Sequence, residues 1–468
     1  MTPRRPNENR HPSGLPQAIL YGVVVGGVST AATILPDWAL VLVTGASYVF
    51  FLVLWRQRFY PDLSYVDPGI LFATVILLYT TIPLITMIAF GYNFSGEGDS
   101  RLAFIALDDG IIRDVWLCCN LVMAGFCASY LAVRKPFMIR LEIGVEPLNW
   151  GLWPTLILST LLFAAFVAAR GFGAYTDEYL FVASLPLLVV QILNISISLL
   201  WASLFGVLIA NARDRIGLAL GLAALFILLF FFASQARTNL VFVAMALLIT
   251  RDHFRKRISA GLLATLAGIG LGTVLLLGLV REGRLFGDAL AQNEFMSVFV
   301  TELDVNQLYV TGSTGQMNLN LVLTDLVRLI PQQLLPFEKV DPASWYINTF
   351  YPDAGAGGAG YAFGMIAESM LGGGAMIGLV RGLVLGAVVS LLLNYLSKKR
   401  NLWASIAYMW LFVNLYECFR DTTFTLGGRF FFQFGPALLI LYLMTKLFVP
   451  GIRGATPPAA RNDARPCP

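Results

Sequence analysis

Arginine and carboxylate side chains stand inside or beside strongly apolar stretches of this chain. Arg237 follows a short polar break in SQARTN, Arg281 and Arg284 flank Glu282 in REGR, and Arg381 lies within a long apolar run. A charge inside a bilayer costs roughly 2.5–3.5 kcal/mol on insertion scales, so such residues tend to be functional. Arginine presents a planar fork that matches paired phosphate oxygens. An anionic phosphate group is therefore the predicted ligand.

A second group of charges lies near the end of the chain. Glu417, Arg420, Asp421 and Arg429 occur close together between two apolar runs, and Glu368 precedes Arg381 along the sequence. A carboxylate beside arginines can act as a general base, while the arginines stabilise a departing anion. The alternative is that Glu368 forms a structural salt bridge and that the arginines snorkel to the membrane surface.

The sequence lacks the residues and motifs that several other common chemistries require. Both histidines, His11 and His253, lie beside basic segments that are predicted to face the cytoplasm, so a site on the opposite face has no histidine. The sequence contains neither a Walker A motif nor a DxD pair. Its five cysteines show no paired spacing, which argues against a disulfide framework or a metal cage. We therefore expect no metal, no cofactor and no nucleic-acid partner.

The composition places this chemistry in a membrane. Of the 468 residues 57% are hydrophobic and only 13% are charged, about half the roughly 25% that is usual in soluble domains. A water-soluble globule could not cover its surface with so few charges. The sequence predicts an all-α polytopic membrane protein. Twelve apolar segments are candidate spans: 16–35, 37–55, 69–90, 115–133, 152–169, 181–210, 216–234, 238–250, 259–280, 373–396, 402–418 and 430–449. The segment 238–250 is short for a full crossing, so 216–250 forms either one span or two.

Basic residues alternate between the ends of these segments, and this pattern orients the chain by the positive-inside rule. Both termini are predicted to be cytoplasmic, and a retained first span is expected rather than a signal peptide. By this topology the charged residues gather near the outer boundary of the membrane. The predicted divisions are a tail at 1–15, a bundle of about nine spans at 16–281, a large extracytoplasmic loop with amphipathic helices at 282–360, about three spans at 361–449 and a tail at 450–468.

Three motifs resemble those of Wzy-type polymerases of O-antigen and related bacterial polysaccharides. SQARTNLVF resembles the family's arginine after a polar break, and GAGYAFGMIAESMLGGG, which includes Tyr361 and Glu368, resembles its glycine-rich entry to a glutamate. FRDTTF resembles an Arg-Gly-Asp-like segment before the last span, but here Asp421 directly follows Arg420. The likeness covers mainly residues 216–430.

The resemblance implies a GT-C-type glycosyltransferase architecture in the bacterial inner membrane. Donor and acceptor would both be polyprenyl-diphosphate-linked oligosaccharides at the outer leaflet. The donor chain would move onto a sugar hydroxyl of the acceptor, with inversion and without a metal. The resemblance also leaves room for a chain-length regulator as a partner.

The resemblance further assigns roles to the charged residues. The arginines that would hold the diphosphate are Arg237, Arg281 and Arg420. Those in support are Arg284 and Arg429. The acid that orients or deprotonates the acceptor would be Glu368 or Asp421. The further substrate-binding residues would be Arg381, Glu417 and Tyr361.

Other classes of protein share part of this pattern. A polysaccharide or lipid flippase also has about twelve spans and internal basic residues, but its charges are expected at mid-depth in several helices. An O-antigen ligase, or another glycosyltransferase that uses a lipid-linked donor, would be a sibling enzyme. The ligase is expected to use an outer-face histidine, which this sequence lacks. A purely structural membrane protein would leave the arginine bias unexplained.

Overall fold

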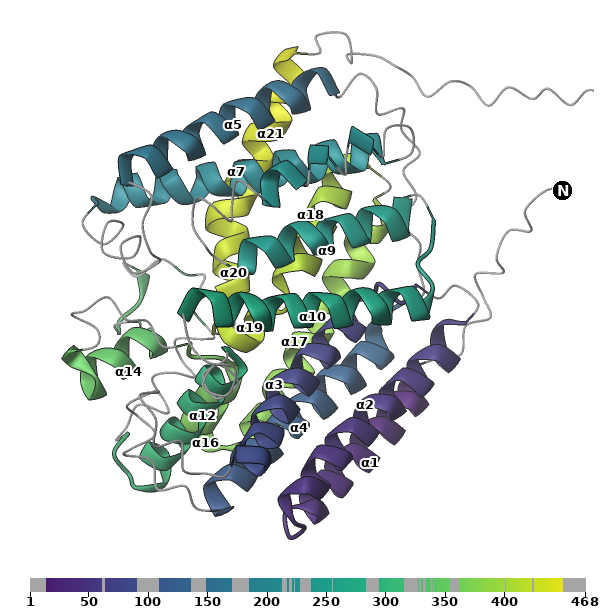
Figure 1. Cartoon of the computed structure of the whole chain (residues 1–468), viewed down its shortest axis with the longest axis vertical. Helices are drawn as coiled ribbons and strands as arrows, with labels where there is room; N and C mark the ends of the chain where they lie inside the picture. The colour runs from purple at the N-terminus through teal and green to yellow at the C-terminus, as the bar shows by residue number, and fades with distance from the viewer. Residues whose placement is uncertain are drawn as a thin grey trace, which may run out of the picture.

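The chain folds into packed helices, as a computed structural model shows (Figure 1). The structure describes residues 14–60, 64–90, 109–135, 149–170, 185–212, 237–254, 256–282, 294–314, 341–353, 362–399, 401–422 and 425–448, with short pieces between 217 and 227 and between 327 and 339. All regular secondary structure in these ranges is helical. This confirms the predicted all-α class for the part of the chain that is described.

Eight helices within the described ranges are long and apolar enough to cross a membrane. They are α1 (Leu15–Ala32), α2 (Asp37–Phe59), α3 (Pro68–Phe90), α4 (Asp109–Val133), α5 (Asn149–Arg170), α7 (Leu187–Asn211), α17 (Ala375–Lys398) and a last span, Leu426–Phe448. Large apolar side chains such as Val380, Leu391 and Leu443 are exposed on their outward faces. Lipid, unlike water, accepts such surfaces. The chain is therefore a multi-pass membrane protein.

The last span contains three helical pieces: α20 (Thr425–Arg429), a π-helical turn η4 (Phe430–Phe434) and α21 (Gly435–Phe448). The remaining helices are α9 (Arg237–Phe254), α10 (Ala260–Glu282), α12 (Glu294–Val310), α14 (Pro342–Phe350), α16 (Met365–Gly373), α18 (Leu402–Asn414) and α19 (Glu417–Arg420). The predicted segment 216–234 lies mostly outside the described residues. So does most of the stretch 315–340 of the predicted loop at 282–360.

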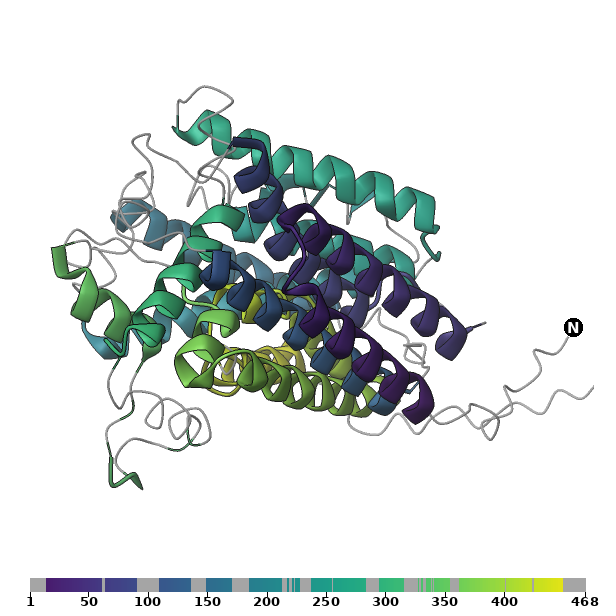
Figure 2. The ribbon, with the colours of Figure 1, turned by 90° about the horizontal axis from the view of Figure 1, so that it is seen from below.

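Helix α4 forms the centre of one group of helices. It packs along α1 and α17, and also contacts α2, α3, α12 and α16. Figure 2 shows the green α17 running beneath the purple and blue N-terminal helices. Gly378, Gly382 and Gly386 of α17 face α4 so closely that a Cβ on Gly382 would lie 2.3 Å from the carbonyl oxygen of Val122. Small residues thus let these two helices pack backbone to backbone.

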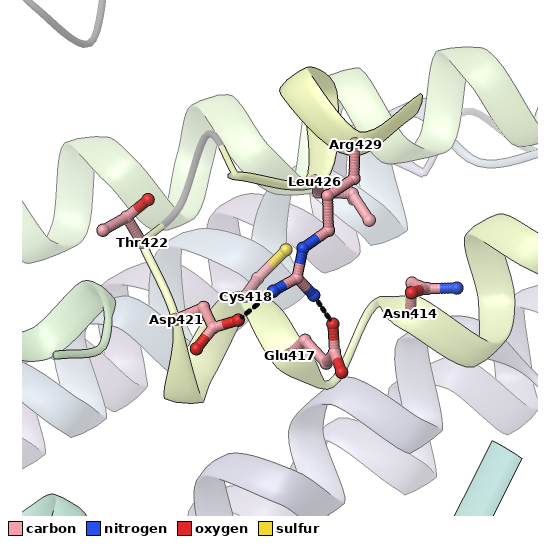
Figure 3. A pocket seen from close by; sticks show the side chains of 7 residues that line it. All are labelled: Asn414, Glu417, Cys418, Asp421, Thr422, Leu426 and Arg429. Carbon is pink, nitrogen blue, oxygen red and sulfur yellow. Dashed lines mark hydrogen bonds and ion pairs between the residues drawn. The ribbon is translucent and has the colours of Figure 1, made fainter. Parts of the chain in front are cut away.

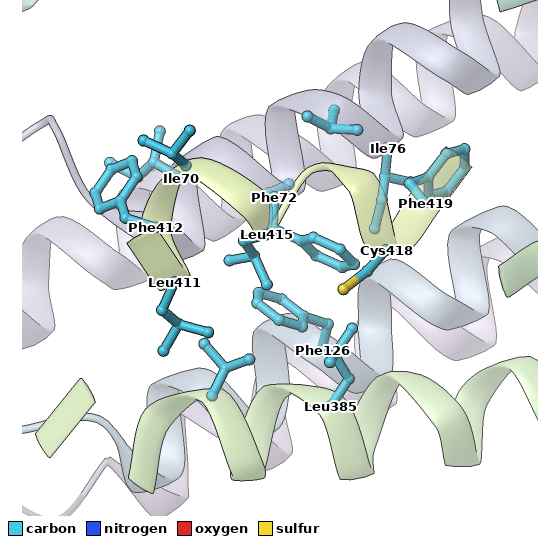
Figure 4. Packing of buried hydrophobic residues seen from close by; sticks show 14 of the residues in the cluster. Ile70, Phe72, Ile76, Phe126, Leu385, Leu411, Phe412, Leu415, Cys418 and Phe419 are labelled. Atoms are coloured by element: carbon cyan, nitrogen blue, oxygen red, sulfur yellow. The ribbon is translucent and has the colours of Figure 1, made fainter. Parts of the chain in front are cut away.

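A second group consists of α5, α7, α9, α18 and the last span, and α18 joins it to α17. Figure 1 shows α5, α7 and α9 lying across the upper part of the molecule. Helix α18 begins at Asn401, whose side chain accepts a hydrogen bond from the backbone N–H of Ala404 at 2.8 Å. An apolar layer that includes Phe72 and Phe126, with ring centroids 4.0 Å apart, lies against α18 and α19 (Figure 4).

The glycines before α17 form a tight turn. Gly373 and Gly374 have φ angles of 132° and 84°, which residues with a side chain rarely adopt. The turn lets the short α16 fold back against α17.

Candidate functional site

Arg429 lies at the start of the last span and is held by two carboxylates (Figure 3). Its guanidinium donates to Oε2 of Glu417 and, through a second nitrogen, to Oδ2 of Asp421 at 2.7 Å. Glu417 begins the short helix α19 and Asp421 directly follows it. Because α19 turns the chain between α18 and α20, both acids are brought against the same arginine.

A small, partly open pocket surrounds this arginine. Its lining residues are Asn414, Glu417, Cys418, Asp421, Thr422, Leu426 and Arg429 (Figure 3). The side chains of Arg429 and Asp421 are 35% and 33% exposed, whereas that of Glu417 is 13% exposed. An anion that enters the pocket can therefore reach the guanidinium and compete with the two carboxylates for it.

A second ion pair is enclosed inside the protein. Arg381 donates to Oε2 of Glu368 at 3.0 Å, and the two side chains are 8% and 1% exposed. The turn at Gly373 and Gly374 brings α16 and α17 together, so that the acid of one helix meets the arginine of the other. Removing one member of such a pair costs about 3–5 kcal/mol, because the other charge stays buried without its partner.

The two ion pairs belong to one region of the molecule. Gly364, just before α16, lies so close to α19 that a Cβ on it would be 1.9 Å from the carbonyl oxygen of Phe419. Cys418 is buried and interacts electrostatically with both Glu417 and Glu368. We call this region the charged cluster. Its members are Glu368, Arg381, Glu417, Asp421 and Arg429.

The charged cluster can bind an anion and move a proton. Arg429 is its accessible cation, and its two carboxylates balance that charge in the structure. An anion with paired oxygens could replace Asp421 on the guanidinium fork. The Asp421 carboxylate would then be available to accept a proton from a neighbouring hydroxyl.

The structure describes some of the other predicted site residues but not all of them. Arg237 begins α9 and Arg281 lies at the end of α10. Figure 1 shows the start of α9 and the end of α10 on the side of the molecule where α14 and α19 lie. Arg420 is the last residue of α19 and interacts electrostatically with Glu417. Arg284 and Tyr361 lie outside the described residues.

Sequence reasoning missed Glu302, a fully buried acid on α12. Within the described part of the chain neither of its carboxyl oxygens has a hydrogen-bond partner. Burial raises the pKa of Glu302 well above its ordinary value. The signal in the sequence was the pair of acids in FMSVFVTELDV, which lies in the extracytoplasmic loop with amphipathic helices predicted at 282–360. In the structure this segment forms α12, which packs against α3, α4 and α16.

A second set of polar side chains lies at the other end of α4 and α17. The Asp67 carboxylate accepts from the Tyr130 hydroxyl at 2.9 and 3.0 Å and from the backbone N–H of Gly69 at 2.9 Å. Arg134 donates to Oδ1 of Asn394 at 2.8 Å. The contacts of Tyr130 with Asp67 and of Arg134 with Asn394 join residues that are far apart in the chain, so sequence spacing could not reveal them.

Asp252 extends this set to α9. It accepts from the Ser64 hydroxyl and from the backbone N–H of Ile258 at 2.7 Å, and His253 lies 3.2 Å from it. The other ring nitrogen of His253 is 3.3 Å from the Tyr408 hydroxyl. Tyr408 in turn interacts with Arg134. We call the whole set the buried polar network: Ser64, Asp67, Tyr130, Arg134, Asp252, His253, Asn394 and Tyr408.

Comparison with known proteins gives no further assignment: no protein-family model, no curated protein and no solved structure matches this chain. Among the described residues, no group of three or more His, Cys, Asp and Glu side chains is arranged to hold a metal ion. The geometry of the charged cluster is therefore the basis for a functional assignment.

Proposed function

We propose that this protein is a membrane glycosyltransferase that joins polyprenyl-diphosphate-linked oligosaccharide repeat units into a polysaccharide. The observation that carries the proposal is Arg429, a partly exposed cation between two carboxylates in a pocket of a membrane-embedded bundle. A lipid diphosphate presents paired oxygens that fit a guanidinium fork. It gains negative charge as the glycosidic bond breaks, so fixed cations stabilise the transition state more than the bound substrate.

In this proposal the arginines bind the donor and an acid activates the acceptor. Arg237, Arg281 and Arg420 hold the diphosphate, with Arg284 and Arg429 in support. The acceptor hydroxyl gives its proton to Asp421 and attacks the anomeric carbon, and the bond to the diphosphate breaks with inversion. Asp421 is favoured over Glu368 because Asp421 is 33% exposed in the pocket, whereas Glu368 is 1% exposed and bound by Arg381.

The topology that this reaction requires is also a proposal. Twelve spans, cytoplasmic termini and an extracytoplasmic segment at 282–360 would place the charged cluster at the outer leaflet of a bacterial inner membrane. Cysteines introduced at Lys339 and Lys399 should then be labelled from opposite sides. Labelling of both from the same side would remove the outer-leaflet site.

Transport of a lipid-linked sugar is a second candidate, favoured by one observation. Arg381 and Glu368 are enclosed among helices, and Arg381 lies within the span α17 rather than in the pocket. Charges inside spans are typical of transport pathways. A flippase would move labelled lipid-linked substrate across a vesicle membrane without lengthening its glycan.

The decisive experiment reconstitutes purified protein in vesicles with a polyprenyl-diphosphate-linked repeat unit and measures product length by mass spectrometry. We expect the wild type to form glycans of two or more repeat units. Arg429→Ala should slow elongation by about 10²–10³-fold, the usual effect of losing one preorganised donor. Arg429→Lys should recover only part of the rate, because a point charge cannot make a two-pronged contact.

The matched control is Arg251→Ala, which removes an exposed arginine at the far end of α9 and should leave the rate unchanged. Arg420→Ala tests the proposed diphosphate set directly and should behave like Arg429→Ala. Near-normal elongation by folded Arg429→Ala and Arg420→Ala proteins would rule out the arginine clamp. Transbilayer movement without elongation by the wild type would instead support transport.

A further inference from the structure

Four helix ends lie together at the end of the bundle opposite the charged cluster. There α17 ends, α18 begins, α21 ends and α5 begins. Helix α18 contacts both α17 and α21, and α5 contacts α21 (Figure 1). Arg429 and Lys446 lie near the two ends of the last span, and at 1.5 Å per residue they are about 25 Å apart along it. This end of the bundle is therefore a separate surface from the pocket around Arg429.

Aromatic side chains mark this end of the bundle. The rings of Trp403 on α18 and Tyr442 on α21 meet edge to face, with centroids 5.3 Å apart. The start of α5 lies against the same part of α21, because a Cβ on Gly151 would be 2.4 Å from the Cα of Thr445. The neighbouring Trp150 is 76% exposed. Tryptophan and tyrosine are enriched where the membrane meets water, so this is the level at which lipid headgroups lie.

Two exposed lysines at this level lie over aromatic rings. The ammonium group of Lys446 is 4.6 Å from the ring centroid of Tyr442. That of Lys399 is 5.2 Å from the ring centroid of Tyr395. Within the part of the chain that the structure describes, neither lysine forms an ion pair with a carboxylate. Their positive charges are therefore not balanced by acids in these ranges.

The two lysines belong to one surface because the connection between α17 and α18 is short. Lys399 caps the end of α17 and Asn401 caps the start of α18, so only one residue lies between the two caps. Trp403 follows in the first turn of α18 and contacts Tyr442, which lies under Lys446. We call this surface the lysine–aromatic patch. Its members are Tyr395, Lys399, Trp403, Tyr442 and Lys446.

An apolar stripe runs along α21 beside the patch. Its members, Leu439, Leu443 and Leu447, are spaced four residues apart and so share one face of the helix. Their side chains are 58%, 50% and 73% exposed. Leu443 lies three residues before Lys446, which places the stripe next to the lysine. A ligand with a phosphate group and an acyl chain can therefore contact the lysine and the leucines together, whereas free phosphate would use the lysine alone.

We propose that the lysine–aromatic patch binds the headgroup of an anionic phospholipid. The two lysines have no acidic partners among the described residues, so a lipid with net negative charge complements them. A zwitterionic phospholipid carries an ammonium group beside its own phosphate and gains less from the lysines. The tyrosine rings hold the ammonium groups at the level of the headgroups. Because the patch is remote from the charged cluster, the inference does not depend on the proposed glycosyl transfer.

The test is competitive lipid binding to the full-length protein in detergent, measured by native mass spectrometry. The probes are phosphatidylglycerol and phosphatidylcholine with identical acyl chains. The wild type should bind phosphatidylglycerol in preference. Lys446→Gln should reduce this preference roughly fivefold, the effect of one lysine near an anionic headgroup. Lys399→Gln should act in the same direction, and binding of phosphatidylcholine should not change.

The matched control is Lys256→Gln, which removes an exposed lysine between α9 and α10, outside the patch. It should keep the wild-type preference. Lys446 and Lys256 are both exposed, so neither change disturbs the packed helices. Equal binding of the two lipids by the wild type, or an equal loss of preference in the two variants, would overturn the site. Displacement of phosphatidylglycerol by excess inorganic phosphate would show that the ligand is free phosphate and would overturn the lipid assignment.

Discussion

The charged cluster and the buried polar network lie at opposite ends of the same pair of helices, α4 and α17. Arg381 belongs to the first and Asn394 to the second, and at 1.5 Å per residue they are about 20 Å apart along α17. The apolar layer of Figure 4, which includes Phe126 and Leu385 from these two helices, occupies the space between. The two regions therefore share a scaffold but differ in how their carboxylates are bonded.

In the buried polar network each carboxylate accepts several hydrogen bonds. Asp67 accepts from a tyrosine hydroxyl and from backbone N–H groups, and Asp252 accepts from Ser64 and Ile258. In the charged cluster Arg429 remains about one-third exposed, and the neighbouring Glu302 has no hydrogen-bond partner in the described part of the chain. Carboxylates that accept several hydrogen bonds stabilise a fold, whereas incompletely satisfied groups are typical of functional sites.

The largest expected effect comes from removing the cation of the network. Arg134→Leu removes the buried guanidinium that acts electrostatically on Asp67 and donates a hydrogen bond to Asn394. Losing a charged donor to a buried acceptor should lower the free energy of unfolding by about 1.5–3 kcal/mol. Thermal or denaturant unfolding of the purified protein measures the change.

Two variants sharpen this prediction. Arg134→Leu combined with Asp67→Asn should recover part of the loss, because the second change removes the uncompensated charge. Arg251→Leu, at an exposed position on α9, should change stability by no more than about 0.5 kcal/mol. An Arg134→Leu protein as stable as the wild type would mean that the network does not hold the helices together.

Much of the fold follows from hydropathy, since a span must be long and apolar. The predicted span 373–396 matches α17, Ala375–Lys398, and 37–55 lies within α2, Asp37–Phe59. Hydropathy, however, does not distinguish a loop outside the membrane from a helix that packs against the end of the bundle. The segment containing α12 was therefore predicted as part of a loop, and the burial of Glu302 could not be anticipated.

The site could be predicted where its residues are close in sequence. Glu417, Asp421 and Arg429 lie within one connection between two apolar runs, and the structure brings them together. Glu368 and Arg381 are separated by a glycine turn that itself has a sequence signature. By contrast, Asp67, Tyr130 and Arg134 meet Asn394 and Tyr408 only through tertiary packing, for which one sequence carries no signal.

A smaller effect on stability is expected at the close contact between α4 and α17, the two helices that both regions share. Gly382→Ala would place a Cβ 2.3 Å from the carbonyl oxygen of Val122 and 3.0 Å from the backbone nitrogen of Phe126. These are backbone atoms, so α4 and α17 must separate. Overpacking of this kind costs about 1–3 kcal/mol, against a gain of about 1 kcal/mol in helix propensity. The midpoint of thermal unfolding measures the balance.

The matched control for Gly382→Ala is Gly27→Ala in α1, where a Cβ would meet nothing within 4 Å. It should be neutral or slightly stabilising, because only the helix propensity changes. Equal unfolding midpoints for the two variants would show that the close approach of α4 and α17 is not required.

The smallest expected effect is the pH dependence of stability that Asp252 contributes. Burial by itself would raise the pKa of Asp252, but the adjacent His253 and the hydrogen bonds from Ile258 and Ser64 outweigh it and lower the pKa below its ordinary value. The folded state therefore favours the carboxylate. Asp252 should stabilise the protein above the unfolded-state pKa of about 3.9 and lose this contribution as the pH falls through the lower, folded-state pKa.

Glu302 should show the opposite sign, because burial raises its pKa and the folded state favours the protonated acid. Its relative destabilisation should begin as the pH rises above about 4.3 and grow until the folded-state pKa is reached. Asp252→Asn should thus lower the unfolding midpoint near neutral pH, and Glu302→Gln should raise it, while both differences shrink in acid. Scanning fluorimetry over a series of pH values measures both. Differences of the same sign would contradict the contrast between a bonded carboxylate in the network and an unbonded acid beside the charged cluster.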